Sequence, residues 1–177
     1  MKKLYPIITA TSLVFIASLA GYHLPATGDQ SPVIPVFIPD DTKVSLKNGT
    51  SLSGRLIKFD SPTKMIALGR DSKTKEVAMK EIKQIEFQGK VTIKSGELVI
   101  RGEGGSSNPN QNRQRWQEPL QNFKIIDVNE GKAEVTITSL DTLKIEGIED
   151  VVRNRSYVVE EIKFNPSDKI EIQVNPH

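Results

Sequence analysis

The chain of 177 residues contains no cysteine. This absence excludes disulfide bonds, thiolate nucleophiles and most structural zinc sites, which depend on cysteine ligands. A protein of this size without disulfides has to be stabilised by its own hydrophobic core or by its partners. The length is enough for one ordinary domain or for two small ones.

Histidine is almost absent as well, since the sequence has only His23 and His177. His23 lies in a proline-rich stretch and His177 is the last residue, so neither is expected to be held rigidly against a carboxylate. Ser–His–Asp catalysis and histidine-rich metal sites therefore lack their essential residue. Adjacent acids such as Glu160 and Glu161 point to opposite faces of a strand and do not line one site. We expect a protein that is not an enzyme and that needs no metal or cofactor.

A clear excess of positive charge is also missing. Lys and Arg number 24 against 22 Asp and Glu, and Lys2 and Lys3 account for the difference. Proteins that bind nucleic acids normally need a positive excess to displace counterions from phosphates. The charge balance therefore argues against nucleic acid as a partner.

The first twenty residues have the three-part pattern of a secretory signal peptide. Lys2 and Lys3 give a positive start, residues 4–19 are largely apolar and uncharged, and the small residues Ser18 and Ala20 mark a cleavage site. We therefore predict a signal peptide over residues 1–20 and a location in the periplasm or outside the cell. An uncleaved leader would instead anchor the chain, and this is the only membrane contact that the sequence predicts.

Residues 21–41 contain four prolines and show no hydrophobic periodicity. Proline fixes φ and favours an extended conformation in the residue before it, which is typical of a tether. The apolar segment 33–38 within this stretch is also compatible with an edge strand or a docking segment.

The rest of the chain is dominated by short strand patterns separated by turns, which predicts an all-β protein. A first β module is predicted over residues 42–101, ending in a hairpin of residues 91–94 and 98–101, and a second over residues 119–177. Between them, residues 102–118 are rich in Gly, Ser, Asn and Gln and predict a flexible linker. Val77–Lys83 resembles Tyr157–Lys163, a similarity that either duplication or convergent strand patterning explains.

Residues 44–60 (VSLKNGTSLSGRLIKFD) resemble the first signature motif of the Sm-like family. That motif has an alternating apolar strand, a Lys-Asn-Gly turn, a glycine within a bent second strand and an ending of an aromatic residue and Asp. The positions that the motif requires are occupied by Val44, Leu46, Gly49, Leu52, Gly54, Leu56, Phe59 and Asp60. The resemblance implies a small, bent, five-stranded barrel that runs to about Phe87.

Members of the Sm-like family are typically RNA binders that assemble into rings, and the resemblance implies RNA contacts at two places. One is the loop after Asp60, which here reads Ser61-Pro62-Thr63-Lys64 and has no Asn. The other is the junction of the last two strands, which here reads Lys83-Gln84-Ile85-Glu86 and has no Arg-Gly. Because both places depart from the family pattern, we expect the fold without these RNA contacts.

The candidate contact residues for a ligand or partner are Arg113, Arg115 and Trp116. Two guanidinium groups beside an indole can stack on bases or sugars, or rest at a membrane interface. The alternative is that Trp116 anchors the linker on the core of the second module while both arginines lie in water. A lone tryptophan is more often packed than displayed, which favours the alternative.

These observations predict an exported, non-enzymatic envelope protein that acts as an interaction or scaffold module. Its partner would be another envelope protein or a second copy of the chain, paired through exposed edge strands. Two alternatives stay open: an RNA-binding Sm-like protein, and a module that binds carbohydrate or cell wall through Trp116.

Overall fold

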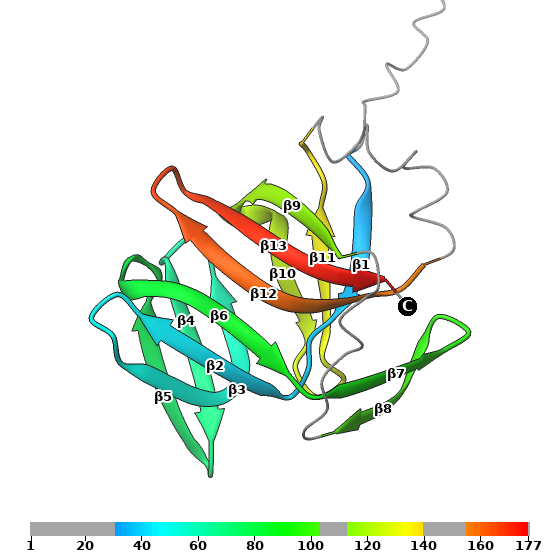
Figure 1. Cartoon of the computed structure of the whole chain (residues 1–177), viewed down its shortest axis with the longest axis horizontal. Coiled ribbons are helices and arrows are strands. Elements are labelled where there is room, and N and C mark those ends of the chain that lie inside the picture. Colours follow the sequence, from blue (N-terminus) through cyan, green and yellow to red (C-terminus); the bar gives the residue numbers. More distant parts are fainter. Residues whose placement is uncertain (1–30, 103–112, 140–154, 177) are drawn as a thin grey trace, which may run out of the picture. The chain divides into compact units, whose positions relative to one another are not determined.

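The computed structural model describes residues 31–102, 113–139 and 155–176, and the predicted signal peptide lies outside them. The described residues belong to one compact unit, Ser31–His177. Most of them are in strands and two single-turn 3-10 helices are the other elements described, so the prediction of an all-β protein is confirmed (Figure 1). The elements are β1 (Val33–Phe37), β2 (Asp41–Leu46), β3 (Ser51–Asp60), β4 (Met65–Arg70), β5 (Lys73–Ala78), η1 (Met79–Glu81), β6 (Ile82–Gln88), β7 (Lys90–Lys94), β8 (Glu97–Gly102), β9 (Gln114–Pro119), η2 (Leu120–Asn122), β10 (Phe123–Asp127), β11 (Lys132–Thr136), β12 (Tyr157–Asn165) and β13 (Lys169–Pro176).

The strands β2–β6 form a bent unit whose neighbours run in the order β6-β2-β3-β4-β5. β2 and β3 meet at the predicted turn, where Gly49 has a φ of 87° and the Asn48 Oδ1 accepts a hydrogen bond of 3.0 Å from the Thr50 N–H. The pairing of β3 with β4 shifts between Leu56 and Lys58. Such a bulge bends a strand, so β3 pairs with β2 along its first half and with β4 along its second. Five strands occupy residues 41–88, the region for which the family resemblance implies five.

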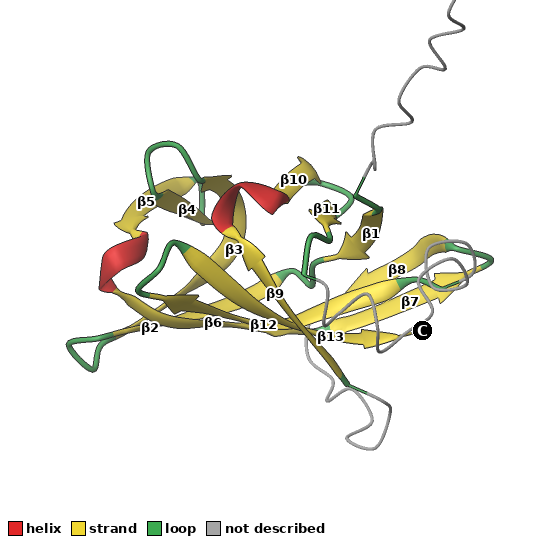
Figure 2. Ribbon diagram, turned by 90° about the horizontal axis from the view of Figure 1, so that it is seen from above, coloured by secondary structure: helices red, strands yellow, loops and turns green. Residues whose placement is uncertain are grey.

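The strands β1 and β9–β13 form the second part of the sheet, in which β10, β11, β1 and β12 are successive neighbours and β13 lies between β12 and β9. The long strand β12 connects this part to the first. Val158 of β12 pairs in parallel with Phe37 of β1, and further along Ile162 pairs antiparallel with Ile85 of β6. Figure 2 shows β2, β6, β12 and β13 as a continuous layer. One sheet therefore joins the two parts.

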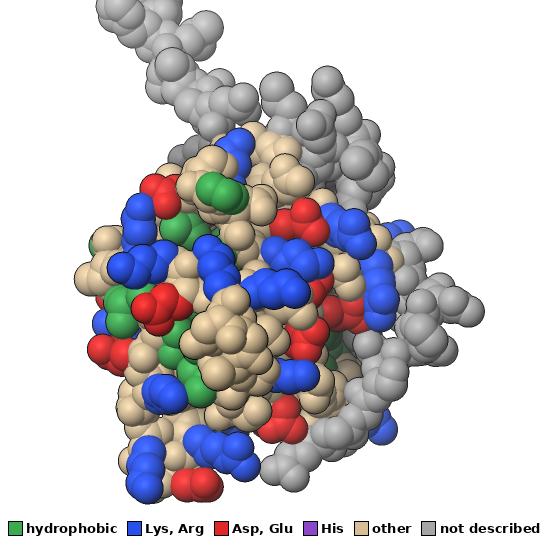
Figure 3. All heavy atoms as spheres, turned by 60° about the vertical axis from the view of Figure 1, so that its left-hand side comes forward, with side chains coloured by type: hydrophobic (Ala, Val, Ile, Leu, Met, Phe, Trp, Pro, Cys, Tyr) green, Lys and Arg blue, Asp and Glu red, His purple; other side chains and the backbone are tan. Residues whose placement is uncertain are grey.

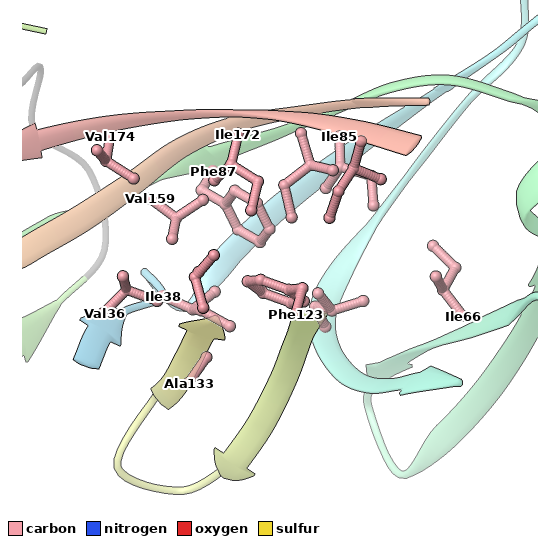
Figure 4. Packing of buried hydrophobic residues seen from close by; sticks show 14 of the residues in the cluster. Val36, Ile38, Ile66, Ile85, Phe87, Phe123, Ala133, Val159, Ile172 and Val174 are labelled. Atoms are coloured by element: carbon pink, nitrogen blue, oxygen red, sulfur yellow. The ribbon is translucent and has the colours of Figure 1, made fainter. Parts of the chain in front are cut away.

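A single hydrophobic cluster runs through both parts of the sheet. The partly buried Phe59 of β3 packs against this cluster, where it meets the buried Phe123 of β10 edge to face at 4.9 Å and stacks on Phe164 of β12 at 6.1 Å. Figure 4 shows side chains from strands far apart in the sequence pointing into this common interior. Full burial of each large aliphatic or aromatic side chain contributes roughly 1.5–3 kcal/mol. Neither part completes its core without the other.

The structure differs from the predicted tether over residues 21–41. Its residues 33–37 form β1, which lies between β11 and β12 and is a central strand. Ile34 and Val36 are each 1% exposed, whereas Val33 and Pro35 face outward. This alternation is the ordinary pattern of a strand, but the prolines around it also fit an extended tether.

The predicted linker over residues 102–118 also differs, because residues 114–118 lie in β9, paired with β13. The predicted modules over residues 42–101 and 119–177 share one sheet and one core. β6 of the first pairs with β12 of the second, and β1 pairs with β11 and β12. Local composition does not reveal these pairings because the partner strands are far apart in the sequence.

A corner of the form strand, 3-10 helix, strand occurs twice, as β5–η1–β6 and as β9–η2–β10. Met79 and Leu120 begin the two helices and are both buried. The Met79 N–H donates to the Lys64 carbonyl at 2.9 Å, and the Leu120 N–H donates to the Asp168 carbonyl at 3.1 Å. Lys64 and Asp168 both have left-handed φ values, and their side chains form an ion pair of 2.7 Å. The two corners are thus tied to equivalent hairpin turns.

The sequence similarity between Val77–Lys83 and Tyr157–Lys163 falls on different elements. The first segment covers the corner β5–η1–β6, while the second lies within the continuous strand β12. Alignment of Met79 with Leu120 instead places residues 118–124 opposite the first segment. The two equivalent corners therefore match residues 77–83 with residues 118–124, and not with the segment that resembles them in sequence.

Candidate functional site

An antiparallel ribbon of β7 and β8 follows β6 and pairs with no other strand in the described part of the chain. Its inner face carries Val91, Ile93 and Leu98, which contact Phe37 of β1 and Val158 of β12. This second cluster is separate from the main core and lies on the opposite face of the sheet. The ribbon therefore packs on the sheet through this cluster.

The base of the ribbon is fixed by Arg101, whose side chain is only 8% exposed. Its Nε lies 3.0 Å from the Asp40 Oδ1, and the Arg55 Nη2 approaches the same oxygen at 2.8 Å. The Arg101 Nη1 also donates to the carbonyls of Val128 and Asn129 at 2.9 and 3.0 Å. Burial lowers the pKa of the Arg101 guanidinium, the charge of Asp40 opposes that shift and the charge of Arg55 adds to it. A buried charge is tolerated when it is paired and hydrogen-bonded. The Arg101 guanidinium is paired with Asp40 through Nε, a contact without hydrogen-bond geometry, and is hydrogen-bonded to the two carbonyls through Nη1.

Two glycines allow the close packing at this base. Gly131 has a φ of 62°, and a Cβ there would lie 2.5 Å from the Ile38 carbonyl and would overlap the Arg101 guanidinium. Gly89, between β6 and β7, has a φ of 129°, and a Cβ there would lie 2.7 Å from the Gly102 carbonyl. A side chain at either position would force the ribbon away from the sheet.

The β8 side of the ribbon faces the β10–β11 turn. Arg101 contacts that turn directly, and Glu97 lies close enough to Lys132 to help raise its pKa, which is raised mainly by Glu130. The register of β8 against β7 shifts between Thr92 and Ile93, which leaves Val99 as the extra residue, 54% exposed. The Arg101 side chain therefore ties the base of β8 to the rest of the protein, and the strand is irregular beyond it.

The β7 edge is regular and pairs only with β8 among the described strands. Val91 and Ile93 face the sheet, while Lys90 and Lys94 are exposed and Thr92 is partly buried. Within the described residues, neither lysine has an ion-pair partner within 4.0 Å. This edge thus presents backbone hydrogen-bonding groups between two unpaired positive charges.

An open polar groove of about 880 Å³ lies over β2–β5, on the other side of Asp40 from the ribbon base. It contains four cationic side chains, of which Arg55 pairs with Asp40 and Arg70 with Asp71, so it holds little net charge. Figure 3 shows Lys and Arg interspersed with Asp and Glu on the side of the molecule that carries these strands. The groove therefore offers no strongly charged or apolar binding surface.

The structure separates the predicted contact residues Arg113, Arg115 and Trp116. Trp116 is 1% exposed and meets Tyr157 edge to face at 5.0 Å, so its indole is part of the core. Arg115 points to the other face of β9, 4.0 Å from Glu171. Arg113 precedes the strand and pairs with Glu160 at 2.8 Å. Alternation along β9 places the indole and the neighbouring guanidinium on opposite faces. This agrees with the favoured alternative of a packed Trp116, although the strand itself lies in the stretch predicted as a linker.

The two places where the family resemblance implies RNA contacts are engaged within the chain. In the loop after Asp60, Lys64 forms its ion pair with Asp168. At the strand junction, residues 84–86 of β6 pair with residues 161–163 of β12. Both segments therefore contact the second half of the protein.

Glu118 is a fully buried carboxylate that points inward from β9. Its Oε2 accepts hydrogen bonds from the Thr138 N–H at 2.9 Å, the Thr138 hydroxyl at 2.6 Å and the Asn122 amide at 3.1 Å. Its Oε1 accepts a hydrogen bond from the Ser139 N–H at 3.0 Å. This carboxylate therefore fastens the segment after β11 and has no open position toward solvent.

Comparison of the chain with protein-family models, with curated proteins and with solved structures gives no match. Within the described ranges, no three His, Cys, Asp or Glu side chains gather closely enough to hold a metal ion. In the same part of the chain, no helix has the length and apolar character needed to span a membrane.

The residues that position and flank the ribbon are not among the contact residues predicted from the sequence. Asp40 and Arg101 are far apart in the sequence, and no local pattern links them. The lysines at the ends of β7 were visible as a strand flanked by charges, a pattern common to edge strands. Only the structure shows that β7 pairs with β8 alone among the strands of the described ranges.

Proposed function

We propose that this protein is an exported, non-enzymatic component of a cell envelope that acts as an interaction or scaffold module through the β7–β8 ribbon. The observation that carries the proposal is the ribbon itself, which Arg101 ties to Asp40 and whose β7 edge has no strand partner in the described structure. Edge strands of this kind accept an additional strand from another polypeptide.

The location rests on the predicted signal peptide over residues 1–20. The mixed charge of the polar groove and the hydrogen-bonded state of Glu118 fit a binding protein better than a catalyst. The carbohydrate-binding alternative depended on Trp116, whose ring is buried against Tyr157. The ribbon is therefore the surface to test first.

Location is tested by fractionating cells that express the full-length chain and by identifying its N-terminus by mass spectrometry. We expect the chain in the envelope fraction, either beginning after Ala20 or retained with its leader as an anchor. An intact chain found in the cytosol with bound RNA would contradict the proposal and favour the RNA-binding alternative.

The interaction surface is tested in the same cells by placing a photo-crosslinking amino acid at Thr92, on the ribbon. Lys75 on β5, another exposed edge strand, is the matched control position. We expect a discrete cross-link to an envelope protein from Thr92 and none from Lys75. Equal cross-linking from both positions would indicate that the ribbon has no special role.

A further inference from the structure

The two edges of the ribbon differ in accessibility. The ion pair and hydrogen bonds made by Arg101 connect the ribbon to the rest of the protein through β8. A register shift at Val99 further breaks the regularity of β8, and bulges of this kind hinder the addition of a strand. β7 has no such contact from its edge in the described structure and pairs in regular register from Lys90 to Thr92. The accessible edge is therefore that of β7.

The ribbon is already ordered before any partner binds. Val91 is 8% exposed and packs with Phe37 and Val158, while Arg101 fixes the opposite strand at its base. An incoming strand would therefore add to a preformed template, and the template itself would lose little conformational freedom.

The charges on β7 disfavour a second copy of the same edge. Antiparallel pairing of two β7 strands centred on Thr92 would place Lys90 of each copy opposite Lys94 of the other. Like charges directly opposite each other on a sheet are destabilising. The same two lysines would instead attract a strand with acidic residues four positions apart, because residues at that spacing share a face.

The alternation of side chains along β7 determines which residue types an added strand needs at its remaining positions. Val91 and Ile93 lie on the face that packs against the sheet, so the residues opposite them in an added strand would extend the apolar cluster of Phe37 and Val158. Lys90, Thr92 and Lys94 lie on the outer face and would be matched by acidic, polar and acidic residues.

We propose that the β7 edge binds an extended protein segment with acidic residues at two positions four apart and apolar residues between them, added as a further antiparallel strand. This rests on the proposed function, and it names the chemistry of the partner and the edge that receives it. Main-chain hydrogen bonds along β7 supply affinity, while the two lysines and the apolar inner face supply selectivity.

The test uses the purified chain from Ser31 to His177, which contains the whole compact unit, and a fluorescein-labelled peptide Ser-Glu-Val-Thr-Val-Glu-Ser. Binding is followed by fluorescence anisotropy and by amide NMR shifts. We expect saturable binding, with shift changes and slowed amide exchange along β7. The double variant Lys90→Glu/Lys94→Glu should bind about tenfold more weakly and should gain affinity for the peptide in which both Glu are replaced by Lys.

The matched control is Lys73→Glu/Lys75→Glu on β5, an edge strand that also carries two exposed lysines. This variant should bind the acidic peptide as the parent protein does. The proposal would be overturned if charge reversal on β7 left the affinity for the acidic peptide unchanged, or if charge reversal on β5 reduced that affinity equally. It would also be overturned if the peptide changed amide NMR shifts elsewhere than along β7. Concentration-dependent dimerisation that is lost in the β7 variant would also overturn it, since a second copy would then occupy the edge.

Failure here is distinguishable from failure of the proposed function. If the peptide does not bind while Thr92 still cross-links to an envelope protein in cells, the interaction role stands and the acidic-strand proposal falls. If the peptide binds but the chain is found uncut in the cytosol, the recognition chemistry stands and the envelope role falls.

Discussion

At the scale of single residues, Arg101 shows how one buried charge organises a surface. Removing a guanidinium from water is costly, and the ion pair with Asp40 and the two carbonyl contacts offset that cost. The geometry requires Gly131 beneath the guanidinium, because no side chain fits there. The ribbon is therefore positioned by residues that lie far apart in the sequence and act together.

The role of Gly131 can be measured with Gly131→Ala and with Gly49→Ala as its control. Both glycines have a left-handed φ, but a Cβ at Gly49 would meet nothing within 4 Å. We expect the control to lose about 1 kcal/mol of unfolding free energy from backbone strain alone. Gly131→Ala should lose about 1–3 kcal/mol more from overlap with Arg101 and Ile38. Urea denaturation gives both values, and equal losses would show that the packing does not matter.

Asp60 should contribute a stability that depends on pH. Its pKa is lowered by the side-chain contact with Lys58 and then by the hydrogen bond from the Thr63 N–H. A carboxyl whose pKa is lower in the folded state stabilises the fold above its ordinary pKa of about 4. That stability is lost as the pH falls through the lowered value.

Thermal unfolding between pH 5 and pH 2 tests this with Asp60→Asn, which should show a smaller fall in melting temperature than the parent protein. Asp71→Asn is the control, because the Asp71 side chain is 88% exposed. An identical fall in the parent protein and in Asp60→Asn would contradict the assignment.

At the scale of elements, tight turns set the register of the hairpins. The β4–β5 turn places Asp71 and Ser72 at φ values of 49° and 61°, the arrangement in which Asp-Gly or Asn-Gly is preferred. The sequence analysis found the Asn48-Gly49 turn from its residues, and the structure confirms it. Ser72 lacks a side chain suited to this conformation, so its turn retains strain that a glycine would relieve.

Ser72→Gly should therefore stabilise the protein by about 0.5 kcal/mol, the net of relieved left-handed strain and the extra freedom of glycine in the unfolded chain. The same substitution at Ser45, within β2, should instead destabilise the protein by about 0.5–1 kcal/mol, because glycine in a strand loses more conformational freedom on folding. Midpoints of urea unfolding at constant slope provide the comparison. A loss of stability at Ser72 would show that the turn is not strained.

At the scale of the whole molecule, the two halves are interdependent. β12 pairs with β1 at one end and with β6 at the other, and the Phe59, Phe123 and Phe164 rings meet between the halves. Long-range pairings of this kind are costly in chain entropy before they are formed, and they favour cooperative folding of the complete unit.

A fragment of residues 42–101 should consequently fail to fold by itself, although it contains five strands of one bent unit and the complete ribbon. It loses the β12 partner of β6 and the aromatic partners of Phe59. Circular dichroism and NMR should show a disordered or aggregated fragment, while the chain from residue 31 to residue 177 unfolds in one transition. A fragment with dispersed amide signals and a cooperative transition would refute this.

The sequence by itself determined the strand content, the Asn48-Gly49 turn and the bent hairpin, because these depend on alternation and on residues adjacent in the chain. It also provided the alternative that Trp116 is packed, which its burial supports. Only the tertiary structure decided that residues 33–37 are a central strand and that β9 belongs to the sheet. The same is true of the Asp40–Arg101 ion pair and of the unpaired β7 edge. These features depend on tertiary contacts between segments that are distant in the sequence. The free energy of those contacts comes from side-chain burial and strand pairing, which no local sequence pattern specifies.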